Sequence, residues 1–323
     1  MVKADGYGLG VAAVVRALEP LDPWGYGLAT VPEALALRRE GITRPLVVFT
    51  PLLPDPALIA ACRGAGVRPV LGDLDALDAW LAGGGGAFHV EVDTGLNRCG
   101  FAWRDRDTLT RLGARVRTYD TFEGIFTHFH SPDADPGTAR AQLERFDAVL
   151  SYFELNPPLV HYTNSAAAGI GLSRHGELAR PGIFLYGGAA GSLVPEPVAA
   201  LRARVVAVRP VRAGDSVSYG ADAVLSRDSR IATVAIGYAD GVPRSLSGTG
   251  RVELHGVSLP IVGRVTMDMV MVDAGELPVG VGDIATVFGG RVSLDEQAAL
   301  GGTVSYELLT RITPRVPRLY NEP

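Results

Sequence analysis

The sequence predicts two parts, an α/β barrel of the (β/α)8 TIM type over residues 1–195 and a mainly antiparallel β domain over residues 196–323. Three observations lead to this fold class. Short β-rich apolar runs alternate with helix-period segments in the first part. Polar side chains stand at the ends of those runs. After about residue 195 the pattern changes to short alternating strands with closely spaced Gly, Pro and Asp turns.

The barrel is predicted from eight strand signals, which suit a closed barrel better than an open doubly wound sheet because no GxGxxG fingerprint appears. Segments such as residues 32–41 and 138–154 lie between them and have helical periodicity. Only "MV" precedes Lys3, so we expect a barrel truncated at its first strand. The eight runs are the stub "VK", "YGLAT", "LVVFT", "VRPVL", "FHVEVD", "GIFTHF", "LVHYT" and "GIFLYG".

The antiparallel domain is predicted from runs such as "LRARVVAVRPVRAGDSVSYG", "RIATVAIGYADG" and "VGDIATVFGG". The segment "PEPVAALRA" marks the boundary, and "VSYELLTRITPRVPRLY" is an amphipathic stretch that closes the chain. No low-complexity linker separates the two parts, so we expect them to be packed together.

Charge and cysteine content narrow the functional classes. The net charge is -5 and no basic block appears, which argues against a nucleic-acid or anionic-membrane surface. No apolar stretch reaches the length of a spanning helix, and Cys62 and Cys99 cannot form a disulfide framework. We expect a cytoplasmic protein with a small-molecule partner, without a metal site.

The polar residues of the first part predict where a site would form. Lys3, Asp93, His128, Asn164 and Arg180 all lie at or just after an apolar run. These positions correspond to the C-terminal rim of a barrel, where barrel enzymes assemble their active sites.

Lys3 is the only lysine of the chain. Every other strongly basic side chain is arginine. A primary amine can lose its proton and form a Schiff base with an aldehyde, whereas guanidinium stays charged and does not act as a nucleophile. The retained lysine therefore suggests an aldehyde cofactor, and pyridoxal 5'-phosphate is the one to expect.

The residues around Lys3 make this more specific. "VKADGYGLG" resembles the "KADAYGHG" signature of the alanine racemase family, fold-type III enzymes that depend on pyridoxal phosphate. The resemblance continues in family order through "VDTGLNRCGF", "THF", "NSAA", "RPGIFLYG", "VSYGA", "IGYADGVPR", "IVGRVTMDM" and "VSYELLTR". It implies interconversion of L- and D-alanine, which supplies D-alanine for peptidoglycan, by a homodimer whose active sites are shared between subunits.

The resemblance also assigns roles to residues. Lys3 resembles the Schiff-base lysine and the base on one face of the substrate Cα, and Tyr219 resembles the opposite base, contributed by the partner subunit. Arg180 resembles the arginine at the pyridine nitrogen, supported by His128. Further implied groups are Tyr7, Asn164, Ser165, Gly182 and Ile183 at the phosphate, Arg98 and Met267 at the substrate carboxylate, and Asp133, Tyr238, Arg244, Arg264 and Asp268 along the access corridor.

Glu91 departs from the family pattern. Many relatives have a carbamylated lysine there, an anion that orients the arginine corresponding to Arg98. Glutamate supplies an anion without modification, but its shorter side chain requires Arg98 to move inward or a bridging water. The alternative interpretation is that Glu91 is a solvated strand residue.

Other functions remain open at this point. A broad-specificity amino-acid racemase would need a roomier pocket, which sequence does not reveal, and a truncated paralogue could bind pyridoxal phosphate without catalysis. A fold-type III decarboxylase would be expected to place a carboxylate at the pyridine nitrogen, and Arg180 argues against it. A barrel-only cofactor carrier would lack the β domain that holds Tyr219.

Overall fold

The computed structural model describes residues 1–151, 159–174 and 177–321. Contacts divide the chain into two compact units, which are described separately. The first comprises Met1–Gly6, Val11–Gly182 and Ala190–Leu193, and the second Tyr7–Gly10, Ile183–Ala189 and Val194–Pro323. The boundary predicted after residue 195 stays a prediction.

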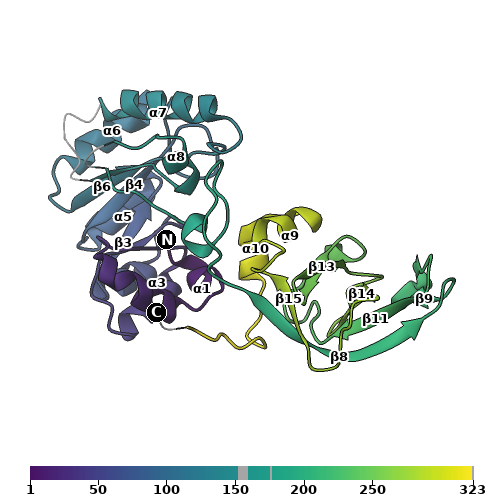
Figure 1. Ribbon diagram of the computed structural model, residues 1–323. Helices are drawn as coiled ribbons and strands as arrows, with labels where there is room; N and C mark the ends of the chain where they lie inside the picture. Colours follow the sequence, from purple (N-terminus) through teal and green to yellow (C-terminus); the bar gives the residue numbers. More distant parts are fainter. Residues whose placement is uncertain (152–158, 175–176, 322–323) are drawn as a thin grey trace. The chain divides into compact units, whose positions relative to one another are not determined.

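The first unit is built on a parallel sheet, as the alternating pattern predicts (Figure 1). Its strands pair in the order β1, β2, β3, β4, β6 and β7, and the short β5 pairs on β4. Six of the eight predicted runs are therefore confirmed as strands. The bounds are β1 Tyr26–Leu28, β2 Leu46–Val48, β3 Val67–Leu71, β4 Phe88–Asp93, β5 Phe101–Ala102, β6 Phe122–Phe126 and β7 Leu159–His161.

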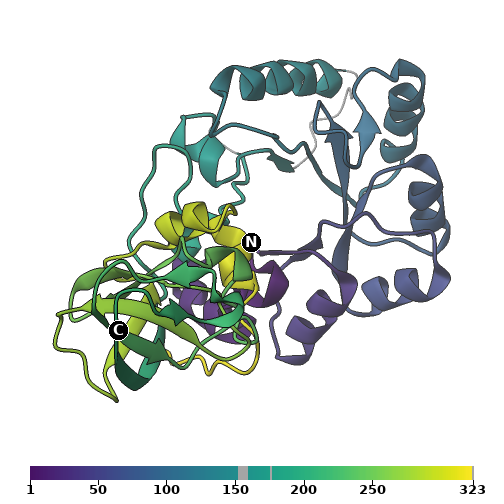
Figure 2. The same cartoon turned by 90° about the vertical axis from the view of Figure 1, so that its right-hand side faces the viewer.

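Two short extended segments close this sheet into a ring. Residues 178–181 run beside β7, where Leu178 N–H donates to Val160 O at 3.0 Å and Asn164 and Arg180 form a parallel bridge. The Met1 nitrogen donates to Pro181 O at 3.0 Å, and Val2 N–H donates to Gly27 O of β1 at 2.8 Å. Figure 2 shows the strands of the first unit in a ring with helices outside.

Two predicted strands differ from the structure. "GIFLYG" is not the eighth strand, because residues 178–181 take that place and Ile183–Tyr186 form the 3-10 helix η2. In the stub "VK", only Met1 and Val2 take part in closing the ring, since Lys3–Tyr7 form a helical turn labelled α1.

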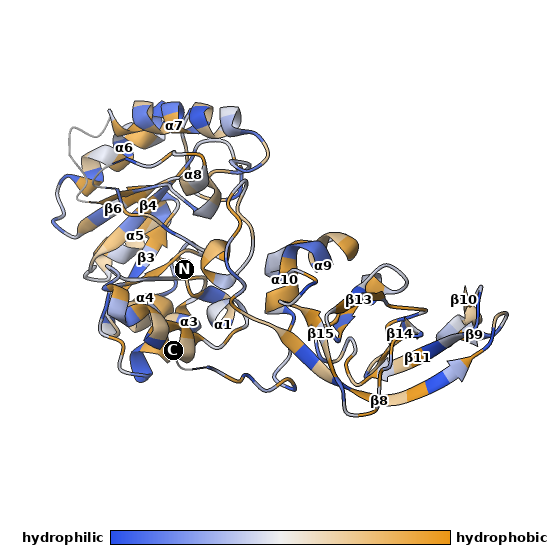
Figure 3. Cartoon of the chain, in the orientation of Figure 1, coloured by the Kyte–Doolittle hydropathy of each residue, from blue (hydrophilic) through white to orange (hydrophobic). Residues whose placement is uncertain are grey.

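The helices of the first unit begin at clear capping signals. Thr30 caps α3 in a capping box with Glu33, and aspartates cap α4, α5, α6 and α7. Figure 3 shows hydrophilic and hydrophobic residues alternating along α7. The bounds are α2 Val11–Leu18, η1 Glu19–Leu21, α3 Val31–Arg39, α4 Pro56–Gly64, α5 Leu74–Ala82, α6 Arg106–Val116, α7 Pro136–Leu150 and α8 Ser165–Gly169.

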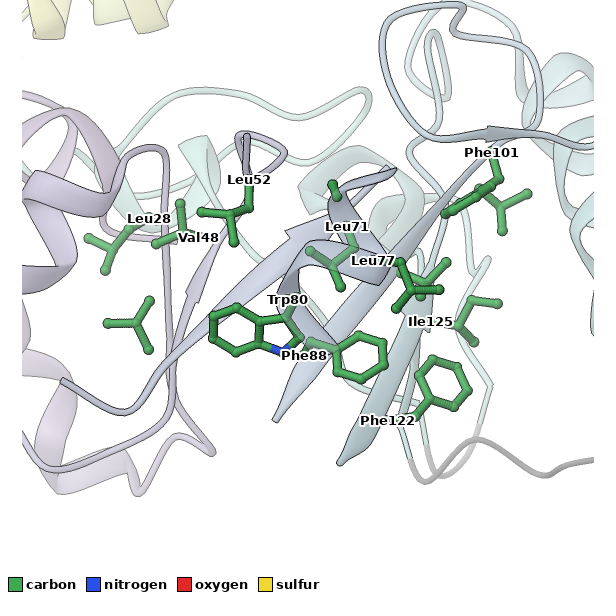
Figure 4. Packing of buried hydrophobic residues seen from close by; sticks show 14 of the residues in the cluster. Leu28, Val48, Leu52, Leu71, Leu77, Trp80, Phe88, Phe101, Phe122 and Ile125 are labelled. Carbon is green, nitrogen blue, oxygen red and sulfur yellow. The ribbon is translucent and has the colours of Figure 1, made fainter. Parts of the chain in front are cut away.

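Alternation along β4 separates two environments. Phe88, Val90 and Val92 belong to the large apolar core that includes Leu77 and Trp80 of α5 (Figure 4). His89 and Glu91 point to the other face because side chains alternate along a strand, and both are buried. The interior of the ring thus holds titratable groups as well as a small apolar cluster of Val47, Val70 and Phe126.

The second unit confirms the predicted antiparallel β domain. Its six-stranded sheet has the order β13, β12, β15, β8, β11 and β14, and β9 pairs with β10. The closing stretch is helical only over α10, and Pro314 and Pro317 follow it. The bounds are β8 Leu201–Val211, β9 Ser216–Val217, η3 Tyr219–Ala221, β10 Ala223–Val224, β11 Ser229–Val234, η4 Arg244–Leu246, β12 Arg251–Leu254, β13 Val257–Pro260, β14 Val270–Gly275, β15 Ile284–Phe288, α9 Leu294–Leu300 and α10 Ser305–Thr310.

Within the described residues, none of the helices combines the length and the apolar character that crossing a membrane requires.

Candidate active site

Lys3 stands where the ring closes, directly before an uncommon backbone turn. Ala4, Asp5, Gly6 and Tyr7 have φ values of 53°, 55°, 62° and 55°, all in the left-handed region. This conformation costs an L residue about 1–2 kcal/mol, so consecutive residues adopt it only where other contacts hold them. The turn carries the Lys3 side chain at the C-terminal rim of the parallel strands.

Glu33 of α3 holds this turn through a hydrogen bond to its backbone. Its Oε1 accepts the Ala4 N–H at 2.8 Å, while Oε2 accepts the N–H groups of Ala29 and Thr30 at 2.8 and 3.0 Å. On the other side of the turn, Asp5 accepts the Val11 N–H at 2.8 Å. One carboxylate therefore serves both the cap of α3 and the residue after Lys3.

The environment of Lys3 favours the neutral amine. Burial lowers the pKa of Lys3, and the positive charges of Arg98 and Arg180 lower it further, while Glu33 acts in the opposite direction. A neutral amine has the free lone pair that a nucleophile or a general base requires.

Arg180 is a buried cation fixed by four acceptors. Nη1 donates to His161 Nδ1 at 2.9 Å, and Nη2 lies 3.1 Å from Thr127 O, 3.3 Å from His128 Nδ1 and 3.4 Å from Tyr162 O. The contact with His128 is the one that the sequence analysis expects. No carboxylate forms an ion pair with Arg180 among the residues that the structure describes.

Two aromatic rings flank this guanidinium. Its carbon lies 5.6 Å from the ring centroid of Phe49 and 5.2 Å from that of Phe126. Burial lowers the pKa of Arg180 to about 10, so the group stays charged at neutral pH. The result is a permanent, rigidly held donor inside the ring.

Both histidines that accept from Arg180 stay neutral. Burial and the neighbouring Arg180 lower the pKa of His128 to about 3, and the same two causes hold the pKa of His161 well below its usual range. Neutral imidazoles can accept from a guanidinium, which imidazolium cannot.

A set of small donors lies where β7 and the closing segment end. Ser165 Oγ accepts the Gly182 N–H at 2.8 Å, and Asn164 caps α8 by accepting the Ala167 N–H at 2.9 Å. The Gly182 amide, expected at a phosphate, is thus directed to Ser165. The serine hydroxyl keeps its own proton for a further acceptor.

Glu91 is not solvated. Its side chain is 3% exposed, and burial raises its pKa to about 7 although Arg98 and Arg180 both lower it. Arg98 is exposed, and in the described part of the chain no hydrogen bond or ion pair joins the two residues. Gly100 leaves room for Glu91, since a Cβ there would lie 2.8 Å from Glu91 Cγ.

In the second unit, Tyr7 stacks on Tyr186 at 4.3 Å between ring centroids, and the ring of Tyr306 lies 6.0 Å away. Burial raises the pKa of Tyr7 and of Tyr186, so both remain phenolic donors. Ile183 begins η2 in the same unit and is buried.

The β domain brings most of the other predicted residues into adjacent loops. The amides of Tyr238 and Ala239 donate to Thr266 O and Met267 O, each at 3.0 Å, and Ser218 Oγ donates to Arg264 O at 2.9 Å. Tyr219 follows Ser218 and is 71% exposed.

Three more of the predicted corridor residues lie at the surface of their own units. Asp268 pairs with Arg315 at 2.7 Å, and Arg244 is exposed at the start of η4. Asp133 is exposed in the loop before α7 of the first unit. No group of three or more His, Cys, Asp or Glu side chains could hold a metal ion in the described ranges.

The chemistry of these groups is specific. The first unit offers an amine whose pKa is lowered, a permanent cation and a hydroxyl donor, which suits an aldehyde-bearing ligand with an acceptor nitrogen and an anionic group. A model described as "Alanine racemase, N-terminal domain" matches residues 1–190, and one described as "Alanine racemase, C-terminal domain" matches residues 198–320. The chain belongs to the alanine racemase family.

Individual members of the family match along almost the whole chain. The alanine racemase of Salinispora arenicola is 40% identical over 340 residues, which cover 99% of this chain and 91% of that protein. A crystal structure of the biosynthetic alanine racemase from Pseudomonas aeruginosa has a TM-score of 0.91 at 33% identity, covering 99% of this chain and 91% of that one.

An alanine racemase from Bartonella henselae, with a TM-score of 0.89 at 29% identity over 99% of this chain and 91% of that chain, is described with covalently bound pyridoxal phosphate. These matches confirm the predicted family and fold, and with them the class of the enzyme as an isomerase.

The family resemblance did not single out several residues of this site. His89 and His161 lie in the predicted strands, Glu33 in a predicted helix and Tyr306 inside the motif "VSYELLTR". Polar residues at alternate positions of a strand buried on both faces, such as His89 and Glu91 in "FHVEVD", are the signal that could have identified the interior histidine.

Proposed function

We propose that this chain interconverts L- and D-alanine with pyridoxal 5'-phosphate carried on Lys3, and that it supplies D-alanine for peptidoglycan. One observation carries the proposal: in a chain that matches alanine racemases from end to end, the only lysine is a partly buried amine whose pKa is lowered. The proposed location is the cytoplasm.

The donor set of the first unit fits the cofactor. Lys3 would form the covalent bond to its aldehyde, and Arg180 would donate to its pyridine nitrogen. Ser165, Asn164 and Gly182 would surround its phosphate, and the family resemblance assigns Tyr7 and Ile183 of the second unit to the same group. When bound, the cofactor withdraws electrons from the substrate Cα and so makes the Cα proton acidic.

Racemisation needs proton transfer on two faces of one carbon. We assign one face to the amine of Lys3 and the other to the phenol of Tyr219. Tyr219 is largely exposed on its own chain, which supports its proposed role in a partner subunit of a homodimer. Its exposure leaves the hydroxyl free to approach a substrate held elsewhere.

The substrate carboxylate is assigned to Arg98 and to Met267 with its amide. Glu91 acts on Arg98 through its charge, since no hydrogen bond or ion pair joins the two side chains in the described part of the chain. The access corridor for this small zwitterionic substrate would be lined by Tyr238, Arg244, Arg264, Asp133 and Asp268.

The proposal is tested by trapping the cofactor. Borohydride reduction of the holoenzyme followed by peptide mapping should place the cofactor on Lys3, and purified protein should form D-alanine from L-alanine. Lys3→Ala should lose both, whereas Arg16→Ala in α2, a matched change at another basic residue, should keep both. Cofactor on Lys3 without turnover would identify a binding protein without catalysis, and comparable turnover of other amino acids would indicate a broad-specificity racemase.

A further inference from the structure

A chain of hydrogen bonds crosses the interior of the barrel from Arg180 to Arg68. Arg180 Nη1 lies 2.9 Å from His161 Nδ1, and His161 Nε2 lies 2.7 Å from His89 Nδ1. His89 Nε2 lies 3.1 Å from Glu123 Oε2, which accepts from Arg68 Nε at 2.8 Å. The series thus joins the closing segment, β7, β4, β6 and β3.

Only one arrangement of protons satisfies this chain. Guanidinium has no acceptor, so Arg180 must donate and His161 Nδ1 must hold a lone pair. A neutral His161 then carries its proton on Nε2 and donates it to His89 Nδ1. His89 in turn carries its proton on Nε2 and donates to Glu123. The donor Arg180 at one end of the chain and the acceptor Glu123 at the other select the same pair of tautomers, and without Glu123 the His89 Nε2 proton loses its acceptor.

The far end of the chain must therefore be an acceptor. Glu123 meets this need as a carboxylate, because the hydrogen bonds from His89 and Arg68 lower its pKa although burial opposes them. An imidazolium at either histidine would place two N–H groups against each other, and burial lowers the pKa of both rings.

Distance from the cation distinguishes Glu123 from an ordinary counterion. A carboxylate in direct contact would form an ion pair with Arg180, whereas Glu123 acts through two neutral rings and forms none with it. Arg68 also lines a cavity of about 510 Å³ with Arg63, Trp80 and Gly86. Glu123 and Arg68 are each the second residue of their strand, so the anchor of the chain lies near the starts of β6 and β3.

We propose that Glu123 is a positioning residue for Arg180: it fixes the tautomers of His89 and His161 so that His161 always presents a lone pair to the guanidinium. The functional part of this inference rests on the proposed role of Arg180 at the cofactor nitrogen. The hydrogen-bond part rests on the geometry alone.

The tautomers can be measured directly. Long-range ¹⁵N–¹H spectra of the holoenzyme labelled in histidine should show both rings neutral and protonated on Nε2, with assignments from His89→Gln and His161→Gln. An Nδ1–H tautomer or an imidazolium at either ring would overturn the inference, and this measurement needs no variant at Glu123.

Variants then separate positioning from packing. Glu123→Leu should release the tautomer of His89 and lower kcat about tenfold with KM for alanine little changed, because Arg180 becomes less well oriented. Glu123→Gln keeps an acceptor oxygen and should restore both readouts, while Glu144→Leu on the exposed face of α7 should change neither. Unchanged tautomers in Glu123→Leu would refute the relay.

Failure of the proposed function would look different. If Arg180→Gln left the absorbance of the bound cofactor unaltered while the wild-type tautomers were as expected, the relay would stand and the assignment of Arg180 to the cofactor would fall. Released tautomers with wild-type kcat would overturn the positioning role of Glu123.

Discussion

Replacing Glu91 with glutamine should stabilise the protein at alkaline pH. Burial raises the folded-state pKa of Glu91 to about 7 from an ordinary 4.5, so the folded chain holds this proton more tightly than the unfolded chain. The stability that this group contributes is fully present below the unfolded-state pKa and is lost as the pH rises through the folded-state pKa. The difference between the two pKa values corresponds to about 3 kcal/mol.

Urea unfolding of wild type and Glu91→Gln at matched cofactor loading measures this effect. At pH 8 the variant should have a free energy of unfolding larger by up to about 3 kcal/mol, and at pH 5 the difference should be less than about 1 kcal/mol. The same variant should lower kcat/KM for alanine, because the charge acting on Arg98 is gone. Glu144→Gln provides an exposed control with little change at either pH. A Glu91→Gln protein that is less stable than wild type at pH 8 would refute the reasoning.

Three further changes test other parts of the structure. Mixed dimers of Lys3→Ala and Tyr219→Phe should recover about a quarter of the wild-type activity, because half of the dimers are mixed and each mixed dimer has one intact site of two. If cofactor-loaded mixtures recover no activity, the active site is not shared between subunits. Glu33→Gln should lower the free energy of unfolding by about 1.5–3 kcal/mol, since one amide oxygen cannot replace two carboxylate oxygens, and unchanged urea unfolding would contradict this. Gly100→Ala should destabilise by at least about 1 kcal/mol because φ is +100° and the new Cβ meets backbone, whereas Gly64→Ala, with open space, should stabilise by about 0.4–1 kcal/mol in thermal unfolding.

The alternation of strands and helices was readable from the sequence because buried parallel strands are short and almost wholly apolar. The eighth strand was misplaced for a physical reason. "GIFLYG" is a short apolar run, and such a run fits a 3-10 turn that buries Ile183 and Tyr186 as well as it fits a strand. The segment around Arg180 that takes the eighth place pairs with its neighbours through backbone hydrogen bonds, but its sequence lacks the β-rich apolar pattern of a strand.

Motifs predicted a rim for the site, and in the structure His128 and Asn164 come shortly after β6 and β7, while Lys3 and Arg180 lie at the two segments that close the ring. They did not reveal what surrounds these residues. The partners of Arg180 depend on which side chains share the ring interior, and Thr127 and His128 reach it from just after β6, more than 50 residues earlier in the sequence. The burial of Glu91 likewise depends on the close approach of Gly100, which no local pattern announces.

The left-handed turn after Lys3 is, in backbone terms, a turn of mirror-image helix that D residues would adopt without cost. L residues keep this conformation only where other contacts hold them, and here Glu33 and the Val2–Gly27 pairing supply those contacts. In an unfolded chain Lys3 is solvated and mostly protonated at neutral pH, which makes it a weaker nucleophile towards an aldehyde. Assembly of the barrel, by burying Lys3, therefore raises the neutral share of its amine and with it the nucleophilicity of residue 3.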